Sequence, residues 1–276
     1  MNEITKLHQQ ISIDTWNRIK FASEVNLKIS ETTLTENLLY LINQHNINSK
    51  NNQISIYEST NEKTNGNDLE IYLEISKNKY IFLAIQAKKL YTKKYKYESI
   101  SHKVNNIYQI NFLLNYAKNQ NGLALYLFYN YFPNYNHNNK EYFGCTLFEA
   151  SAIKKTYYPL SKTQWTIPSF ESLHTYNKLN SYCTKSKLSA VPWHFLTNKK
   201  YIKKYVDLYN KLNTQSLKEY LYDEIDEDEW IQIDEDTTSS KAKSLHTIGM
   251  VESPSCVKTI NQFFKPKFRI IINQDN

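Results

Sequence analysis

The stretch Asp68-Leu-Glu-Ile-Tyr-Leu-Glu-Ile75, followed by Tyr80-Ile-Phe-Leu-Ala-Ile-Gln-Ala-Lys88, decides how the middle of this chain folds. In both halves apolar and polar side chains alternate with a period of two, which is typical of β-strands with two different faces. We therefore expect a β-hairpin, in which opposed residues share a face. A three-residue turn at residues 76–78 would set Asp68 opposite Gln86, with Lys88 two residues further on the same side.

The register of this hairpin depends on the length of its turn, because a slip of one residue moves every side chain to the other face. A two-residue turn would divide the polar side chains between the faces, so we expect an odd number of turn residues. An ordinary amphipathic hairpin with one solvated face is the alternative interpretation, since short motifs give false positives.

The segments around the hairpin predict a mixed α/β fold. Apolar residues at helical spacing indicate helices within 30–42 and 93–118, and a short apolar run indicates a strand at 53–58. The nearly continuous apolar run 123–129 is typical of a strand covered on both faces. The order helix, strand, strand, strand, helix, strand predicts one mixed central sheet flanked by helices.

We divide the chain into three parts. Residues 1–152 are expected to form the α/β core, and residues 153–222 a mainly helical extension. The remainder, 223–276, is expected to be an acidic linker and a C-terminal tail, because 223–236 carries nine acidic residues and no Lys or Arg. The apolar run Phe268–Ile272 favours a strand within the tail.

Composition excludes several classes of protein. The chain has 276 residues and only four glycines, and it lacks the Gly-rich patterns of nucleotide-binding loops. Its three cysteines are far apart, so we expect neither disulfides nor structural zinc.

The sequence also bears on location and partners. No targeting segment or membrane-spanning run is recognisable, which favours a cytoplasmic protein. The formal net charge of +7 favours a polyanionic partner such as nucleic acid.

Three residues of the hairpin resemble a known catalytic signature. Asp68, Gln86 and Lys88 look like the PD-(D/E)xK nuclease motif, in the Gln-x-Lys form that is similar to Mrr-like endonucleases. Glu36 matches the helix glutamate that often joins that site, and the resemblance covers about residues 30 to 130. It implies a restriction-endonuclease-like α/β fold and metal-dependent hydrolysis of phosphodiester bonds.

The resemblance also implies roles for these side chains. Asp68, Gln86 and Glu36 would hold Mg²⁺, with Mn²⁺ as an alternative, because oxygen ligands suit hard cations. The metal would lower the pKa of a bound water, and Lys88 would orient that water or stabilise charge in the transition state. Gln86 departs from the acidic form of the motif, and a neutral amide should hold the ion more weakly.

Two groups of residues near the motif have alternative interpretations. Glu36 could instead close a capping box with Thr33, and local sequence favours neither role. A basic run and one glutamine could contact nucleic acid, or could form a solvated helix face; these residues are Lys89, Lys93, Lys94, Lys96 and Gln109.

The C-terminal tail contains a second resemblance, to sliding-clamp-binding peptides, through Ile260, Phe263 and Phe264. Docking of this segment on the body as a strand or helix is the favoured alternative.

These patterns together predict a Mg²⁺-dependent DNA endonuclease, with DNA favoured over RNA and with defence against foreign DNA as a candidate role. A nucleic-acid-binding module whose nuclease site has lapsed and an RNA-directed nuclease toxin are the alternatives. A homodimer is a candidate assembly.

Overall fold

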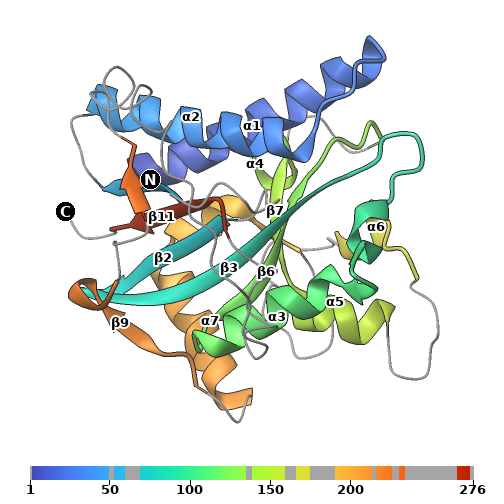
Figure 1. Cartoon of the computed structure of the whole chain (residues 1–276). Helices are drawn as coiled ribbons and strands as arrows, with labels where there is room; N and C mark the ends of the chain where they lie inside the picture. The colour runs from blue at the N-terminus through green and yellow to red at the C-terminus, as the bar shows by residue number, and fades with distance from the viewer. Residues whose placement is uncertain are drawn as a thin grey trace, which may run out of the picture.

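The computed structural model describes residues 2–49, 53–59, 69–134, 139–158, 166–174, 190–212, 216–225, 230–233 and 266–273. Over these residues the chain has a mixed α/β fold, in which one central sheet lies between two layers of helices, as the sequence predicts (Figure 1). The sheet has nine described strands: β1 (Ile54–Ser59), β2 (Leu69–Ser76), β3 (Lys79–Lys89), β6 (Leu123–Tyr129), β7 (Cys145–Glu149), β8 (Val191–Pro192), β9 (Glu219–Leu221), β10 (Trp230–Gln232) and β11 (Phe268–Ile272).

The strands follow the order β10-β1-β11-β2-β3-β6-β7-β8. Strand β9 pairs antiparallel with the first residues of β3, 79–81, which precede the part of β3 that pairs with β6. Strands β2 and β3 form the expected antiparallel hairpin. Strand β6 runs parallel to β3, and helix α3 (Gln109–Asn119) makes the connection between them. A parallel pair needs such a crossover, because a tight turn can join only antiparallel strands.

The register of the hairpin is the predicted one. Leu69 pairs with Ile85, and Ile71 pairs with Leu83. The turn itself is different, because Ser76 pairs with Lys79 and only two residues, 77 and 78, lie between them. An irregularity between Glu74 and Ser76 adds the extra residue to β2. This bulge corrects the register that a two-residue turn alone would shift.

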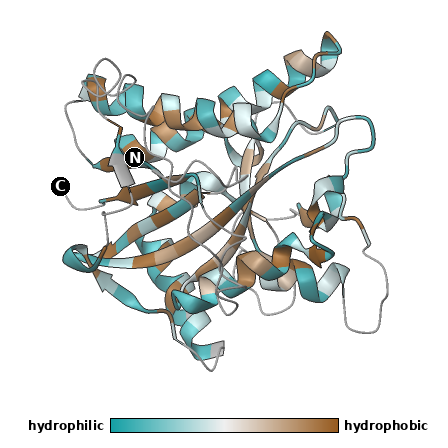
Figure 2. Ribbon diagram, in the orientation of Figure 1, coloured by the Kyte–Doolittle hydropathy of each residue, from teal (hydrophilic) through white to brown (hydrophobic). Residues whose placement is uncertain are grey.

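The helices cover both faces of the sheet. Helices α1 (Glu3–Glu24) and α2 (Glu31–Ser49) lie along one face, and α3 and α5 (Ala150–Tyr157) lie on the other (Figure 1). Helix α2 is joined to the sheet by a 2.9 Å hydrogen bond between the hydroxyls of Thr35 and Tyr129. Because helices cover both faces, the centre of the sheet is hydrophobic along β3 and β6 (Figure 2). The hairpin therefore has no solvated face at its centre.

The single helix predicted for 93–118 was wrong in its first half. The chain forms a turn at 92–95, a 3-10 helix η1 (Glu98–Ser101) and a small hairpin of β4 (Lys103–Val104) and β5 (Ile107–Tyr108). The helix α3 begins only at Gln109. Asparagine tolerates the left-handed backbone conformation and favours turns, and it stands at both central positions of the hairpin turn, 105 and 106.

The C-terminal strand lies inside the sheet rather than in a separate tail. Strand β11, expected from Phe268–Ile272, pairs antiparallel with β1 and parallel with β2.

The extension after residue 152 is helical in part. It contains most of α5, followed by α6 (Phe170–Leu173), η3 (Trp193–Thr197), α7 (Lys199–Leu212) and η4 (Tyr222–Glu224). It also contains β8, which pairs with β7, and β9, which pairs with β3. A short helix, α4 (Lys140–Phe143), precedes β7. The clamp-like residues Ile260, Phe263 and Phe264 lie outside the described residues.

None of the described helices is both long enough and apolar enough to cross a membrane.

Candidate active site

The C-terminal end of β3 carries Gln86 and Lys88, the two residues of the predicted Asp68, Gln86 and Lys88 motif that the structure describes. Gln86 and Lys88 lie on the same face of the strand, and both are buried, with exposed fractions of 1% and 5%. Asp68 lies outside the described residues. In the sequence it precedes Leu69, and Leu69 pairs with Ile85, the residue before Gln86.

Lys88 is held by the helix that crosses over to β6. Its ammonium group donates a hydrogen bond to Oε1 of Gln109 over 3.0 Å. Gln109 is the first residue of α3, so the crossover helix starts directly over the end of β3. The structure therefore brings together Lys88 and Gln109, two residues that the sequence assigned to separate roles.

The side-chain amide of Gln86 has no such contact. Neither its oxygen nor its nitrogen has a hydrogen-bond partner among the described residues, although both atoms are buried. A buried polar group without a partner costs about 1–3 kcal/mol, so such groups are uncommon and call for a physical explanation. A ligand that the amide oxygen contacts is one such explanation.

Glu31 is the carboxylate of α2 that reaches this end of β3. Its Oε1 accepts hydrogen bonds from the backbone N–H of Lys89 and from the hydroxyl of Ser99, each over 2.9 Å. The sequence did not indicate Glu31 as a residue of the site. The signal for its position in the sequence was Ser30, which directly precedes it. The Ser30 hydroxyl accepts a hydrogen bond from the backbone N–H of Thr33 and so caps α2.

Glu36 is placed differently from the prediction. It lies on the exposed side of α2, and its Oε1 is 3.2 Å from the ammonium group of Lys267. Glu36 does not cap the helix with Thr33, because Ser30 occupies the capping position. Among the described contacts, none joins Glu36 to Gln86 or Lys88.

A buried ion pair lies on the same face of the sheet, at the start of β2. The guanidinium of Arg269 contacts one carboxylate oxygen of Glu70, and the hydroxyl of Tyr116 donates to the other over 2.7 Å. Burial raises the pKa of the Glu70 carboxyl, while Arg269 and Tyr116 oppose this effect. Arg269 belongs to β11 and Tyr116 to α3, so this cluster ties the C-terminal strand to the crossover helix.

A family of unknown function (DUF6615) matches residues 4–262 of the chain. The chain belongs to this family. No curated protein and no solved structure matches it.

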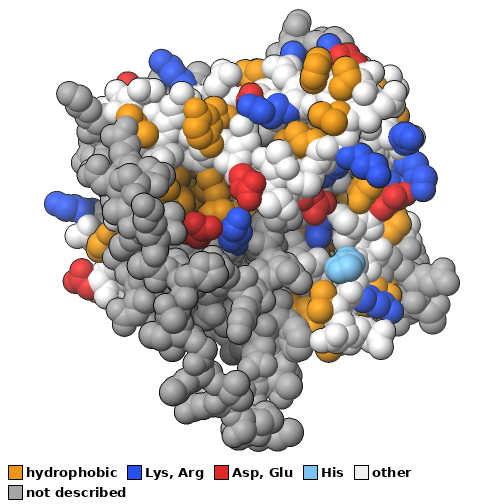
Figure 3. All heavy atoms as spheres, turned by 45° about the horizontal axis from the view of Figure 1, so that its top comes forward, with side chains coloured by type: hydrophobic (Ala, Val, Ile, Leu, Met, Phe, Trp, Pro, Cys, Tyr) orange, Lys and Arg blue, Asp and Glu red, His pale blue; other side chains and the backbone are white. Residues whose placement is uncertain are grey.

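Two of the four predicted DNA-contacting lysines have partners within the chain, one of them half-buried and the other exposed. The ammonium group of Lys89 donates to the backbone carbonyl of Ile29, and burial lowers the pKa of Lys89. Lys94 forms an ion pair with Glu98 over 2.7 Å. Lys93 and Lys96 are exposed. On the face of the molecule that carries α1 and α2, lysines and arginines are interspersed with acidic and hydrophobic side chains (Figure 3).

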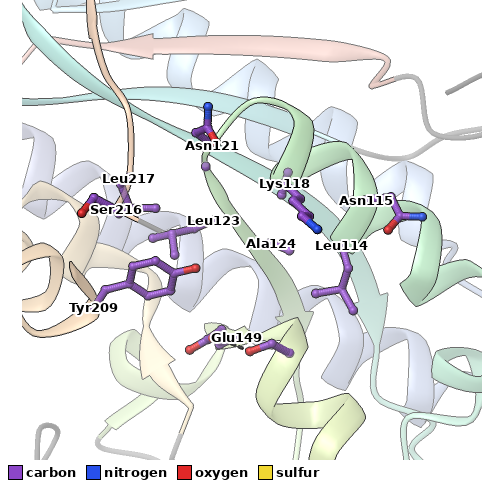
Figure 4. Close-up of a pocket in the computed structure, with 13 residues that line it drawn as sticks. Leu114, Asn115, Lys118, Asn121, Leu123, Ala124, Glu149, Tyr209, Ser216 and Leu217 are labelled. Atoms are coloured by element: carbon purple, nitrogen blue, oxygen red, sulfur yellow. Dashed lines mark hydrogen bonds between the residues drawn. The ribbon is translucent and has the colours of Figure 1, made fainter. Parts of the chain in front are cut away.

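The pocket in Figure 4 lies elsewhere in this DUF6615 chain. It measures about 310 Å³ and is formed at the start of β6 by residues of α3, β7 and α7, including Lys118, Glu149 and Tyr209. Leu123, which lines it, pairs with Leu83, whereas Phe128 at the other end of β6 pairs with Lys88. The pocket and the end of β3 are therefore different places, and no predicted site residue lines the pocket.

Within the described part of the chain, no three His, Cys, Asp or Glu side chains are grouped so that they could hold a metal ion. Asp68, which lies outside the described residues, is not among these side chains.

Proposed function

We propose that this chain is a metal-dependent nuclease that hydrolyses phosphodiester bonds of DNA in the cytoplasm. The observation that carries the proposal is the pair Gln86 and Lys88, buried on one face at the end of β3. Asp68 is joined to Leu69 by one peptide unit of about 3.8 Å, and Leu69 pairs with the residue before Gln86. In the predicted register Asp68 would lie opposite Gln86, so an acid, an amide and an amine would meet at this end of the hairpin.

The order of elements supports the proposal. Helix α2 is followed by β1, by the β2–β3 hairpin, by α3 and by β6, which lies parallel to β3. The nuclease resemblance implies a mixed sheet of this kind. Strand β11, which lies between β1 and β2, is an addition to that arrangement.

The donor set fits a hard divalent cation such as Mg²⁺. Gln86 offers a buried amide oxygen without a partner among the described residues, and Asp68 would offer a carboxylate. Glu31 has a further carboxylate at the end of β3, where it contacts the backbone of Lys89 rather than Gln86 or Lys88. Both of these hydrogen bonds to Glu31 end on Oε1, so they leave Oε2 as the carboxylate oxygen that they do not use. When bound, the ion would supply a more acidic coordinated water and would polarise the scissile phosphate.

Lys88 supplies the fixed positive charge of the site. An ammonium group that is buried and held in place before the reaction stabilises charge on the transition state without reorganisation. Gln109 positions this ammonium group through the 3.0 Å hydrogen bond. Glu31 positions the backbone of Lys89 and so fixes the direction in which β3 ends.

The test compares cleavage by the wild-type protein with cleavage by two lysine variants. Supercoiled plasmid DNA and a structured RNA are incubated with the protein in Mg²⁺ or in EDTA. Lys88→Ala should lose about 10²- to 10³-fold in rate. Lys204→Ala, which removes an exposed lysine of α7, is the matched control and should cut like the wild type. Thermal melting of all three proteins shows whether they are folded.

Three results would contradict the proposal. Cleavage that survives Lys88→Ala would place the activity elsewhere or in a contaminant. Binding of DNA without any cleavage would favour a module whose nuclease site has lapsed. Cleavage restricted to RNA would favour an RNA-directed nuclease.

A further inference from the structure

The segment between η1 and α3 is attached to the candidate site at both ends. At one end Ser99 donates its hydroxyl hydrogen to Glu31 over 2.9 Å. At the other end Gln109 accepts from the ammonium group of Lys88 over 3.0 Å. The backbone N–H of Gln109 also donates to the carbonyl of His102 over 3.0 Å, which closes the base of the intervening hairpin.

The hairpin itself is short and conformationally defined. Lys103 pairs with Tyr108, and Val104 pairs with Ile107, so only Asn105 and Asn106 form the turn. Both have positive φ angles, 49° and 63°. Two successive left-handed residues define a type I′ turn, whose twist matches that of the flanking strands, and asparagine is favoured there.

The side chains that the hairpin presents are polar, basic or apolar, but never acidic. The exposed residues are His102, Lys103, Asn105, Asn106 and Ile107, and 45% of Ile107 is exposed. In the sequence no Asp or Glu occurs between Glu98 and Glu141. A polyanion can therefore approach the hairpin without repulsion from a carboxylate in this part of the chain.

The base of the hairpin is anchored by aromatic rings. The ammonium group of Lys103 lies 4.5 Å from the centre of the Tyr108 ring, and this ring packs on Tyr158 with a centroid distance of 4.9 Å. The tip lies about three residues from Gln109, which is about 10 Å along a strand. A duplex held at the hairpin tip would therefore have its backbone within reach of Lys88.

We propose that the hairpin 102–108 enters a groove of duplex DNA and determines which sequences the candidate site cuts. This inference rests on the proposed nuclease function. A two-stranded β-ribbon fits the major groove, an asparagine amide can pair with an adenine edge, and an apolar side chain can contact a thymine methyl group. Lys103 contacts a phosphate beside the groove.

A protein partner is the less favoured occupant. Protein interfaces are built around a large apolar centre, whereas this tip exposes one isoleucine among amides and cations.

The experiment separates binding from cutting. Fluorescence anisotropy of a labelled mixed-sequence duplex is measured in EDTA with Lys88→Ala protein, so that no cleavage occurs. Three changes are added to this background: Lys103→Ala, Ile107→Ser, and the double change Asn105→Gly with Asn106→Gly. Glycine tolerates the positive φ angles, so the double change removes the amides and retains the turn.

The control for Ile107→Ser is Ile47→Ser, because Ile47 lies near the end of α2 and is 43% exposed. Ile107→Ser and the double glycine change should each weaken binding by about 5- to 100-fold, as loss of a base contact does, and Ile47→Ser should leave it unchanged. Lys103→Ala should weaken binding and should also lower the slope of log affinity against log salt concentration by about 1, because one phosphate contact is lost. The double glycine change should leave this slope unchanged.

Cleavage by the same hairpin variants, now with Lys88 restored, supplies the second readout. The glycine variant should redistribute the cut positions on a long duplex. Variants that bind and cut like the parent would overturn the hairpin inference and leave the nuclease proposal intact. A wild-type protein that neither binds nor cuts DNA would overturn both the hairpin inference and the nuclease proposal. Melting temperatures of the variants within 2–3 °C of the parent, a difference of about 1 kcal/mol in stability for a chain of this size, would exclude misfolding as the cause of weaker binding.

Discussion

The ammonium group of Lys88 and the side-chain oxygen of Gln109 lie 3.0 Å apart, and their hydrogen bond joins the end of β3 to the first residue of α3. The two residues are separated by a 3-10 helix and a hairpin along the chain. Their contact means that the crossover between two parallel strands also orients the cation of the candidate site.

Gln109→Ala should reduce the cleavage rate constant while leaving DNA affinity nearly unchanged, because Gln109 positions Lys88 and need not hold the substrate. Single-turnover kinetics at increasing protein concentration give both quantities, the rate constant at saturation and the affinity from the half-saturating concentration. An unaltered rate constant would mean that the hydrogen bond serves stability alone.

Changes at Gln86 should separate stability from function. Gln86→Leu removes a buried amide without a described partner and should raise the free energy of unfolding by about 1–3 kcal/mol, while cleavage is lost. Gln86→Glu adds a charge and should tighten Mg²⁺ binding. Urea denaturation and calorimetric titration with Mg²⁺ measure the two effects. A stabilised and fully active Gln86→Leu protein would remove Gln86 from the site.

Glu31, rather than Glu36, should be the carboxylate of α2 that activity requires. Glu31→Gln retains an oxygen acceptor for the N–H of Lys89 but removes the charge, so cleavage should fall much more than stability. Glu36→Gln removes an exposed partner of Lys267 and should change both by little. The cleavage rates and melting temperatures of the two matched variants decide. The opposite order of activity would restore the role that the sequence assigned to Glu36.

The ion pair between Glu70 and Arg269 should be costly to break from one side. Arg269→Met leaves the buried Glu70 carboxyl without its cation and should lower the free energy of unfolding by about 3–5 kcal/mol. Adding Glu70→Leu should recover much of this loss, because no uncompensated charge then remains buried. Lys267→Met, in an exposed ion pair, is the control and should cost no more than about 1 kcal/mol. Additive effects of the two core changes would contradict this account.

Acid should destabilise the fold through buried histidines. Burial lowers the pKa of His8 to about 3 and those of His174 and His194 to about 4, against an ordinary value of 6.5. The neutral rings contribute their full stability above pH 6.5. As the pH falls towards 4 the unfolded chain binds protons that the folded chain does not, so stability is lost.

The melting temperature should therefore decline between pH 6.5 and 4, and His8→Phe should decline less steeply, because phenylalanine cannot take up a proton in the unfolded state. His102→Gln, at an exposed position, should follow the wild-type curve. Equal slopes for His8→Phe and wild type would show that His8 does not contribute.

Local pattern was sufficient for some elements of this fold. The alternation in β2 and β3 fixed their register even though the turn is shorter than expected, because a bulge compensates for it. The sequence also indicated that β6 is covered on both faces, since an apolar run leaves no solvated side. Pattern failed for 93–108, where helical spacing of apolar residues was coincidental and asparagine turns prevailed.

The sequence by itself determined the strands β1, β2, β3, β6 and β11 and the register of the β2–β3 hairpin, because alternation and turn preference act between residues close along the chain. Only the tertiary structure decided that β11 pairs between β1 and β2, that Glu31 reaches the end of β3, and that Gln109 holds Lys88. These choices depend on which distant groups can satisfy a buried hydrogen bond or charge, and that becomes defined only when the whole core packs.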